Sequence, residues 1–272
     1  MSDKVTRHYA GGGDLAQAIA DSLRRAGKDT SGLTTVDLAT VDEFHIRGRK
    51  ATLELGQSLN LSAASHILDI GSGLGGPART LAETYGCRVT GVDLTPEFCE
   101  AAATLSNWVG LGDRVAFRQG DATDLPFGDA EFDAAITIHV AMNIAAKDKM
   151  YREAKRVLKP GARFAVYDVL QGEGGEVLFP VPWAREQSIS HLATPDAMSL
   201  LLTGAGLTIL DIQDSTEESE RWFEDMAARM GQSAPAVTFQ TFLGNDFPLM
   251  VRNQVRNLQD RRIRTVTYIC EA

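Results

Sequence analysis

Short apolar runs alternate with longer amphipathic segments between residues 65 and 170, and this alternation constrains the fold of the 272-residue chain more than any other feature. It predicts strands at 65–70, 88–92, 114–119, 132–138 and 162–170, and helices at 76–85, 96–109 and 147–158. Strands that are joined by helices of this length form a parallel sheet covered on both faces. We therefore expect an α/β fold built on a Rossmann-like sheet.

Helical patterns are also found on both sides of this region. Asp14 is placed to cap a helix that carries Leu15, Ile19 and Leu23, and further helices are expected at 48–59, 195–204, 217–230 and 247–262. Two more strands are predicted at 207–213 and 265–270. Residues 1–13, which end in three glycines, are expected to be poorly ordered, and residues 171–194 form a long loop rich in glycine and proline.

Composition argues against several kinds of partner and site. The net charge of -9 disfavours nucleic acid, because an acidic surface repels phosphates. The three cysteines are widely spaced, which disfavours a disulfide framework or a metal site. The N-terminus has no apolar stretch typical of a secretory signal, and no apolar run is long enough to cross a membrane. We expect a cytoplasmic protein without a membrane partner, and a monomer or a homodimer.

A glycine-rich segment, Asp69-Ile70-Gly71-Ser72-Gly73-Leu74-Gly75-Gly76, joins the first predicted strand to the next helix. Glycines let the chain turn tightly and let a ligand approach, and the start of a helix favours a negatively charged group. Two interpretations compete. Gly71, Gly73 and Gly76 fit the dinucleotide pattern G-x-G-x-x-G, which alone is weak. The segment also fits D-x-G-x-G-x-G, in which Asp69 can bind the positively charged amino group of a methionine moiety.

Two more acidic residues follow the second and third predicted strands. Asp93, in Val92-Asp93-Leu94, can accept hydrogen bonds from both hydroxyls of a ribose, in NAD and in S-adenosylmethionine alike. Asp121, in Gln119-Gly120-Asp121-Ala122, can accept one from the amino group of an adenine, or it can simply cap its own loop. The carboxyl ends of parallel strands meet at one edge of the sheet, so a nucleoside site is expected there.

Jointly these motifs resemble those of the class I S-adenosylmethionine-dependent methyltransferases, over about residues 64–170. The resemblance also includes Leu125-Pro126-Phe127, Phe132-Asp133, Glu153 and Arg156-Val157-Leu158-Lys159-Pro160-Gly161. It implies seven strands in the order 3-2-1-4-5-7-6, with the last strand antiparallel, and the cofactor S-adenosylmethionine across the ends of strands 1 and 2. The residues expected to bind it are Asp69, Gly71, Ser72, Gly73, Gly75, Asp93, Leu94, Asp121, Ala122 and His139.

Three other segments resemble a small-molecule branch of that family, which includes sarcosine/dimethylglycine N-methyltransferases and ubiquinone- or tocopherol-type C-methyltransferases. They are residues 41–49, Met142-Asn143, and Pro182-Trp183-Ala184-Arg185-Glu186. The resemblance is nearest to the sarcosine/dimethylglycine members. It implies an N-terminal helical lid at 1–63 and a methyltransferase domain at 64–272, with insertions at 171–194 and 214–263.

Two histidines are the candidate catalytic residues. His139 follows the fourth predicted strand, at the edge where ligands bind, and it can accept a proton, contact the acceptor or play only a structural role. His45 belongs to the segment that folds over the cofactor in relatives, so it can contact the acceptor. A base is needed only if the acceptor atom arrives protonated.

The remaining candidates concern the acceptor pocket, which is expected to include Phe44, His45, Met142, Asn143, Phe179 and Trp183. The two aromatic residues of the long loop can wall the pocket or stabilise a cationic amine. Three arginines, Arg47, Arg49 and Arg185, can hold a carboxylate, although each is better explained as solvated surface.

The sequence thus predicts an enzyme that transfers a methyl group from S-adenosylmethionine to a small molecule by in-line displacement, at an amine, an oxygen or a ring carbon. Two alternatives stay open. Gly71, Gly73 and Gly76 also suit an NAD-dependent oxidoreductase, although the chain has no evident Tyr-x-x-x-Lys pair. The acidic helix at 217–230 also suits a non-catalytic S-adenosylmethionine-binding protein.

Overall fold

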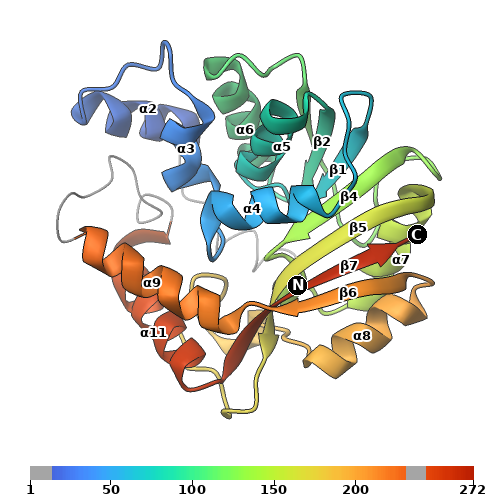
Figure 1. Cartoon of the computed structure of the whole chain (residues 1–272). Helices are drawn as coiled ribbons and strands as arrows, with labels where there is room; N and C mark the ends of the chain where they lie inside the picture. The colour runs from blue at the N-terminus through green and yellow to red at the C-terminus, as the bar shows by residue number, and fades with distance from the viewer. Residues whose placement is uncertain (1–13, 231–242) are drawn as a thin grey trace.

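A seven-stranded sheet with the strand order β3-β2-β1-β4-β5-β7-β6 organises the molecule (Figure 1). The structure is a computed structural model that describes residues 14–230 and 243–272, so the predicted disorder at 1–13 lies outside it. The strands are β1 His66–Ile70, β2 Arg88–Asp93, β3 Val115–Gln119, β4 Phe132–Ile138, β5 Leu158–Gln171, β6 Thr208–Asp214 and β7 Ile263–Glu271. Neighbours from β3 to β5 pair in parallel, and β7 is antiparallel to both β5 and β6. The predicted order and the antiparallel last strand are confirmed.

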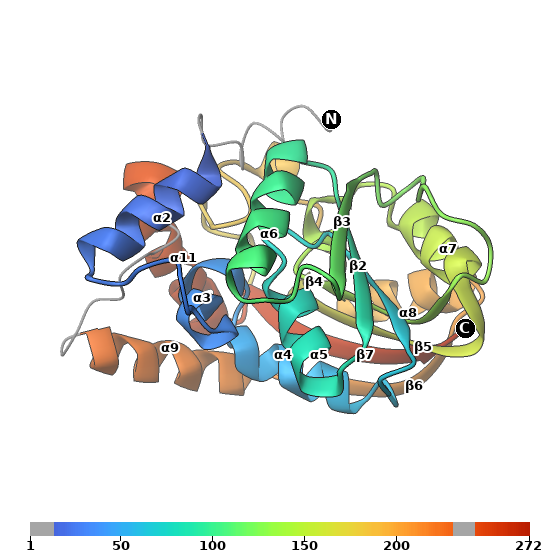
Figure 2. The ribbon, with the colours of Figure 1, turned by 90° about the horizontal axis from the view of Figure 1, so that it is seen from above.

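Helices cover both faces of the sheet, as the strand–helix alternation requires (Figure 2). The described helices are α2 Leu15–Arg25, α3 Thr35–Asp42, α4 Gly48–Gln57, α5 Gly76–Tyr85, α6 Pro96–Trp108, α7 Lys147–Val157, α8 Pro195–Gly204, α9 Thr216–Met230 and α11 Phe247–Gln259. One buried cluster joins α4 and α5 to the sheet, and a second joins α7 and α8 to the opposite face. The central strands are therefore buried on both sides, which explains why they are apolar throughout.

The N-terminal helices form a small layer of their own. Asp14 caps α2 by accepting a hydrogen bond from the amide of Gln17, as predicted. Helix α3 was not predicted, although Thr34 and Asp37 form a capping box at its start. Buried apolar residues of α2 and α3 pack together with residues of α6, so this layer rests on the edge of the sheet that carries the nucleoside motifs.

The fifth strand begins earlier than its sequence suggests. Lys159-Pro160-Gly161 was expected to close α7, but the strand starts at Leu158, which pairs with Phe132. The register then shifts, and Ala134 pairs with Arg163. Gly161 absorbs the irregularity with a φ of 77°, a conformation that glycine adopts at little cost. Pro160 and Gly161 thus lie in an irregular strand start and not in a helix end.

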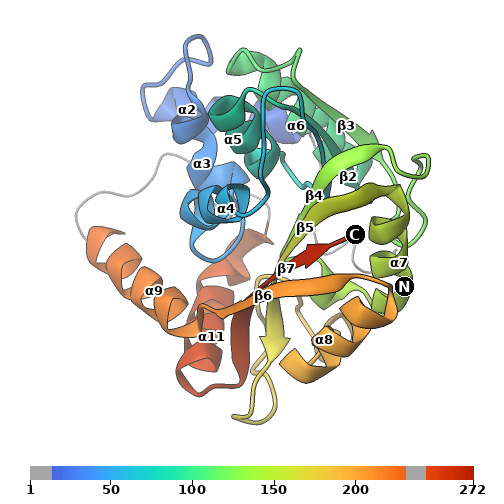
Figure 3. The ribbon, with the colours of Figure 1, turned by 45° about the vertical axis from the view of Figure 1, so that its right-hand side comes forward.

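The last part of the chain builds a separate wall beside the sheet. Figure 3 shows α9 and α11 side by side next to the ends of β6 and β7. Their apolar residues form one cluster with the long loop, which includes Trp183, Phe223 and Leu258. Within the described residues, no helix is both long and apolar enough to cross a membrane.

Candidate active site

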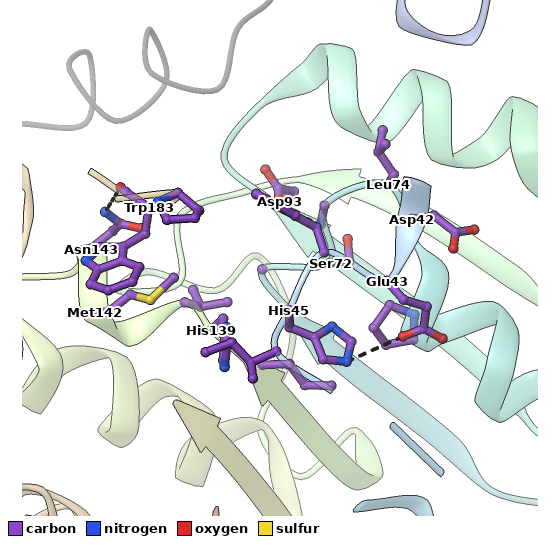
Figure 4. A pocket seen from close by; sticks show the side chains of 18 of the residues that line it. Asp42, Glu43, His45, Ser72, Leu74, Asp93, His139, Met142, Asn143 and Trp183 are labelled. Carbon is purple, nitrogen blue, oxygen red and sulfur yellow. Dashed lines mark hydrogen bonds and ion pairs between the residues drawn. The ribbon is translucent and has the colours of Figure 1, made fainter. Parts of the chain in front are cut away.

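One large cavity, of about 1250 Å³, lies at the carboxyl ends of β1, β2, β3 and β4. Its lining comes from the segment 39–50, from the glycine loop, from the residues after the strand ends, and from the wall of α9 and α11. Figure 4 shows Met142, Asn143 and Trp183 on the left, His139 near the centre, and His45 to its right, below Asp93 and Ser72. The cavity therefore joins the predicted nucleoside edge of the sheet to the predicted acceptor pocket.

The glycine loop has three glycines with left-handed backbone, and two of them also lie against a neighbouring side chain. An added Cβ at Gly71 would lie 2.3 Å from Cγ2 of Val140, and one at Gly75 would lie 2.4 Å from Cζ of Phe117. Gly73 has a φ of 50°, and none of the described atoms lies within 4 Å of its added Cβ, so the space beside it is open. Gly71 and Gly73 line the cavity, whereas Gly75 caps α5 outside the lining that the described residues define. Gly75 thus has a packing role here.

Asp69 lies at the end of β1 with a carboxyl group that is almost fully buried, at 1% exposure. Its Oδ2 atom has no hydrogen-bond partner among residues 14–230 and 243–272, and the same holds for Oγ of Ser72. Burial, together with the nearby carboxylates of Glu43 and Asp93, raises the pKa of Asp69 to about 8. An unpaired buried carboxyl is costly, so this end of the cavity is suited to a cationic group with N–H donors.

Two backbone amides hold the carboxylate of Asp93 in place. Oδ2 accepts a hydrogen bond from the amide of Gly73 at 2.9 Å, and Oδ1 accepts one from the amide of Thr95 at 2.9 Å. Each carboxylate oxygen has a second lone pair, so both can still accept a hydroxyl. Burial raises the pKa of Asp93, although these amide contacts oppose the rise. The carboxylate is thus held in one position on the cavity wall, together with the adjacent Leu94.

Asp121 both caps its loop and lines the cavity. Its Oδ1 accepts hydrogen bonds from the amide and the hydroxyl of Thr123, each at 2.8 Å. Ala122 lies beside it on the cavity wall. Asp121 therefore caps its own loop, which is one of the two roles predicted for it. Its side chain is exposed and also borders the space where an adenine is expected.

His45 is held as a neutral imidazole with a defined tautomer. Its Nε2 lies 2.9 Å from the carbonyl oxygen of Gly48, which can only accept, so Nε2 carries the proton. The same nitrogen lies 3.3 Å from Oγ1 of Thr52, which itself donates to Glu43. Burial lowers the pKa of His45 to about 4. Nδ1 therefore keeps its lone pair at neutral pH.

His139 occupies a strained position at the end of β4. Its φ is 54°, which is unusual for a residue with a Cβ, and its amide donates to the carbonyl of Tyr167 at 2.8 Å. Its ring centroid lies 6.0 Å from that of His45 and 4.9 Å from that of Tyr167. Nε2 is buried without a hydrogen-bond partner in the described part of the chain, and burial lowers the pKa well below its usual value. Strain and an unpaired polar atom at a cavity are typical of functional positions.

The predicted acceptor residues are largely brought together. Phe44, His45, Met142, Asn143 and Trp183 all line the cavity, but Phe179 packs behind it in the buried cluster of the wall. Nδ2 of Asn143 donates to the carbonyls of Trp183 at 2.8 Å and Ile189 at 2.9 Å, and thereby fixes the long loop. Trp183 is 1% exposed, and its indole N–H donates to Oγ of Ser190 at 3.0 Å.

The three arginines proposed as carboxylate ligands are already paired. Arg47 is buried and forms ion pairs with Glu54 and Glu218. Arg49 donates to the hydroxyl of Thr80 and to Glu83, and Arg185 pairs with Asp246. Arg47 and Arg49 line the cavity with charges that their own neighbours balance. They are therefore poorly suited to hold a charged acceptor.

Two groups of site residues were missed in the sequence. The first is the pair of buried residues Asp42 and Arg79, whose ion pair of 2.7 Å joins α3 to α5, where Arg79 also binds the carbonyl of Leu74 in the glycine loop. The capping box of α3 could have revealed this helix. The second is the inner face of α9 and α11, with Trp222, Phe223, Met226, Phe247, Val251 and Gln254. The sequence predicts both helices, at 217–230 and 247–262, but it does not show which of their residues face a ligand.

Comparisons with known proteins agree with this geometry. Residues 68–166 match the family described as a methyltransferase domain. The methyltransferase GfsG of Streptomyces halstedii is 32% identical over 189 residues, which cover 67% of this chain and 67% of the relative. The O-methyltransferase cnsE of Penicillium expansum is 31% identical over 204 residues, covering 72% of each chain.

A solved structure also shares the fold. Geranyl diphosphate C-methyltransferase from Streptomyces coelicolor A3(2), in complex with Mg²⁺, geranyl diphosphate and S-adenosyl-L-homocysteine, matches with a TM-score of 0.70 and 17% identity. The match covers 99% of this chain and 97% of that chain. The domain match and the two relatives support methyl transfer over the oxidoreductase and the non-catalytic alternatives.

Proposed function

The chain belongs to the class I S-adenosylmethionine-dependent methyltransferases that act on small molecules, and from this premise we propose how its cavity is divided. The half at the ends of β1, β2 and β3 holds the cofactor, and the half beneath α9 and α11 holds an apolar acceptor. The observation that carries this proposal is the unpaired carboxyl of Asp69 beside the open space at Gly73. That combination fits an amino acid with a free ammonium group and leaves a pyrophosphate without a favourable contact.

The cofactor half is assigned residue by residue. Asp69 binds the ammonium group, with Ser72 and the backbone of Gly71 and Gly73 beside it. Asp93 accepts the ribose hydroxyls, and Asp121 and Ala122, with Leu94, border the adenine. The unpaired oxygens of Asp69 and Ser72 support this assignment because a ligand would satisfy them.

Transfer takes place where the two halves meet, beside His45 and His139. S-adenosylmethionine supplies an activated methyl group, which the acceptor attacks while the carbon–sulfur bond breaks and S-adenosylhomocysteine leaves. If the acceptor atom carries a proton, Nδ1 of His45 receives it, since Nε2 is committed to Gly48. His139 contacts the acceptor or the cofactor from the opposite side.

The acceptor half favours an apolar small molecule over a charged one. Its walls are formed by Ile46, Met142, Trp183 and the inner faces of α9 and α11. The arginines at its border are neutralised by Glu54, Glu218 and Glu83. This weakens the suggestion of a sarcosine-like amino acid as the acceptor.

Several wider assignments belong to the same proposal. Residues 1–63 act as a lid, and residues 64–272 form the methyltransferase domain with insertions at 171–194 and 214–263. The ion pairs of Asp42 with Arg79 and of Arg47 with Glu218 support a lid that bridges the cofactor half and α9. We place the reaction in the cytoplasm and expect a monomer or a homodimer.

The test combines binding and turnover. Calorimetric titration should show binding of S-adenosylmethionine and S-adenosylhomocysteine, and methyl-labelled S-adenosylmethionine should label members of a panel of apolar alcohols, phenols and amines. Tight binding of NADH without binding of S-adenosylmethionine would overturn the cofactor assignment. Binding without turnover of any apolar acceptor would overturn the acceptor assignment.

The histidines need their own variants. For an acceptor that carries a proton, His45→Ala should lower turnover by about 100-fold, the usual contribution of a general base. His139→Ala should also lower turnover, because it removes a contact at the transfer site. The affinity for S-adenosylmethionine should change by less than about twofold, because neither contact carries much of the cofactor binding energy. His191→Ala is the matched control, since His191 lies outside the lining formed by the described residues. A collapse of cofactor binding in either variant would show that the histidine is structural or a main cofactor contact.

A further inference from the structure

Helix α11 carries three amide side chains along its inner side, and two of them have structural partners. Asn253 donates to the carbonyl of Pro180 at 2.9 Å. Asn257 accepts from the amide of Leu178 at 2.8 Å and donates to its carbonyl at 3.0 Å. Both residues therefore pin the long loop against the helix. The third amide, that of Gln254, does neither.

Gln254 is 6% exposed and lines the cavity. Its side-chain amide makes no hydrogen bond to any residue in the described ranges, which end at 230 and resume at 243. Phe247, Val251 and Gln254 are spaced at i, i+4 and i+7, so they share the face of α11 that borders the cavity. The amide atoms of Gln254 are not among the fully buried unpaired polar atoms of the described residues, so they stay open to the cavity and can pair with a ligand that enters it.

The amide of Gln254 is a polar group in a part of the cavity wall that is otherwise apolar. Trp222, Phe223 and Met226 face the cavity from α9, and Phe247 and Val251 face it from α11. In an apolar ligand pocket, a few polar groups in defined positions fix the orientation of the ligand, while the apolar walls supply the contact area. Because an amide is neutral and can both donate and accept, it pairs with a hydroxyl or a carbonyl and gains little from a full charge.

We propose that Gln254 is a specificity-determining residue, which recognises a hydroxyl or carbonyl group on an otherwise apolar acceptor. This inference rests on the proposed function, because it places the acceptor beneath α9 and α11. It deepens that proposal by naming the acceptor class, an uncharged and mainly hydrocarbon molecule that carries an isolated oxygen function. Asn253 and Asn257 on the same helix show that such amides do find partners where the fold offers them.

Ligand binding tests the idea without a known substrate. Trp183 and Trp222 line the cavity, so their fluorescence reports occupancy in the presence of saturating S-adenosylhomocysteine. The probes are matched pairs: 2-naphthol and naphthalene, geraniol and its deoxygenated hydrocarbon, and a monohydroxysteroid and its parent steroid. The wild type should bind at least one oxygenated member about tenfold more tightly than its hydrocarbon, since a site built to bond a hydroxyl rejects the analogue that lacks it.

Two variants of α11 separate this role from general damage. Gln254→Met keeps the length of the side chain and removes the amide, so the oxygen preference should fall to within about twofold. Gln259→Met is the matched control on the exposed side of the same helix and should keep the full preference. Affinity for S-adenosylhomocysteine and the melting temperature check that both variants are folded.

The outcomes distinguish the two proposals. An oxygen preference that survives in Gln254→Met, or a wild type that binds hydrocarbons and oxygenated probes equally, overturns the inference and leaves the proposed function intact. A wild type that binds S-adenosylhomocysteine but no probe of either kind contradicts the apolar acceptor of the proposed function, and the inference fails with it.

Discussion

The two halves of the cavity are built in opposite ways. In the cofactor half, the chain fixes its own polar groups with backbone contacts, as when Asp93 accepts from the amides of Gly73 and Thr95. In the acceptor half, apolar side chains from α9, α11 and the long loop form the walls, and most polar groups are used to hold those walls together. One half presents preformed polar contacts, and the other presents shape and apolar area.

This difference shows how one fold combines a constant reaction with a variable acceptor. In the proposed division, the sheet ends and the tight glycine loop would provide the contacts to a cofactor of fixed structure. The acceptor walls come from helices whose side chains can change while the helix keeps its place. Variants of the cofactor half should therefore reduce cofactor affinity, and variants of the acceptor half should change acceptor kinetics alone.

The largest expected effect concerns Asp93. Asp93→Ala removes the predicted ribose contact and frees the amides of Gly73 and Thr95, so affinity for S-adenosylmethionine should fall by about 1.5–3 kcal/mol, or roughly 10- to 150-fold. Calorimetric titration measures the change. An unchanged affinity would show that the adenosine does not lie along the end of β2, and the division of the cavity would then be wrong.

Binding of the cofactor at Asp69 should depend on pH. Its pKa of about 8 means that the free protein holds a proton on this carboxyl at neutral pH, whereas the ammonium group of the cofactor requires the carboxylate. Binding should therefore release a proton, and affinity should rise with pH up to the pKa, by at most about tenfold per unit between roughly pH 6 and pH 7.5. The folded protein alone behaves in the opposite sense, since the raised pKa stabilises it at low pH and this contribution is lost as the pH rises through about 8.

Titrations in buffers of different ionisation enthalpy measure that proton release directly. In Asp69→Asn the affinity should become nearly independent of pH over the same range, because the titrating group is gone. A wild type with no proton release would contradict the placement of the ammonium group at Asp69.

Most of the fold, and most residues that line the proposed cofactor half, could be predicted because their signals are local. Gly71, Gly73 and Asp93 stand next to strand ends that the apolar pattern already places, and the parallel topology then brings those ends together. Gly75 shows the limit of such a pattern. Gly75 matches the motif, but its left-handed φ and the close ring of Phe117 show that packing requires a glycine there. It is not part of the cavity wall that the described residues form.

The acceptor half could not be predicted to the same depth, because its residues meet only through tertiary packing. In the sequence, Gln254 is one of several polar residues on an amphipathic helix, and nothing local separates it from Asn253 or Gln259. Its burial depends on where α11 packs against α9 and β7. Likewise, Phe179 was expected in the pocket because it shares a loop with Trp183, yet only the tryptophan lines the cavity that the described residues enclose.

A pair of glycines tests how closely the cofactor approaches the loop. Gly73 and Gly110 both have left-handed backbone, and an added Cβ at either meets none of the described atoms within 4 Å. Each alanine variant should lose about 1–2 kcal/mol of stability from backbone strain. Only Gly73→Ala should also weaken S-adenosylmethionine binding, by about tenfold, or 1.4 kcal/mol. Equal cofactor affinity in the two variants would mean that the space beside Gly73 is not used by the ligand.

A substitution in the acceptor half should have the smallest effect on the affinity for S-adenosylmethionine. Trp222 lines the cavity from α9, and its ring contacts Phe223 with centroids 4.9 Å apart. Trp222→Leu removes aromatic area from the chamber, so KM for an apolar acceptor should rise severalfold, in line with a loss of about 1 kcal/mol. S-adenosylmethionine affinity should stay within about twofold of the wild type, because none of the assigned cofactor contacts comes from α9. Steady-state kinetics with each substrate varied in turn separates the two effects, and a comparable loss of cofactor affinity would show that the halves are coupled through the lid by Arg47 and Glu218.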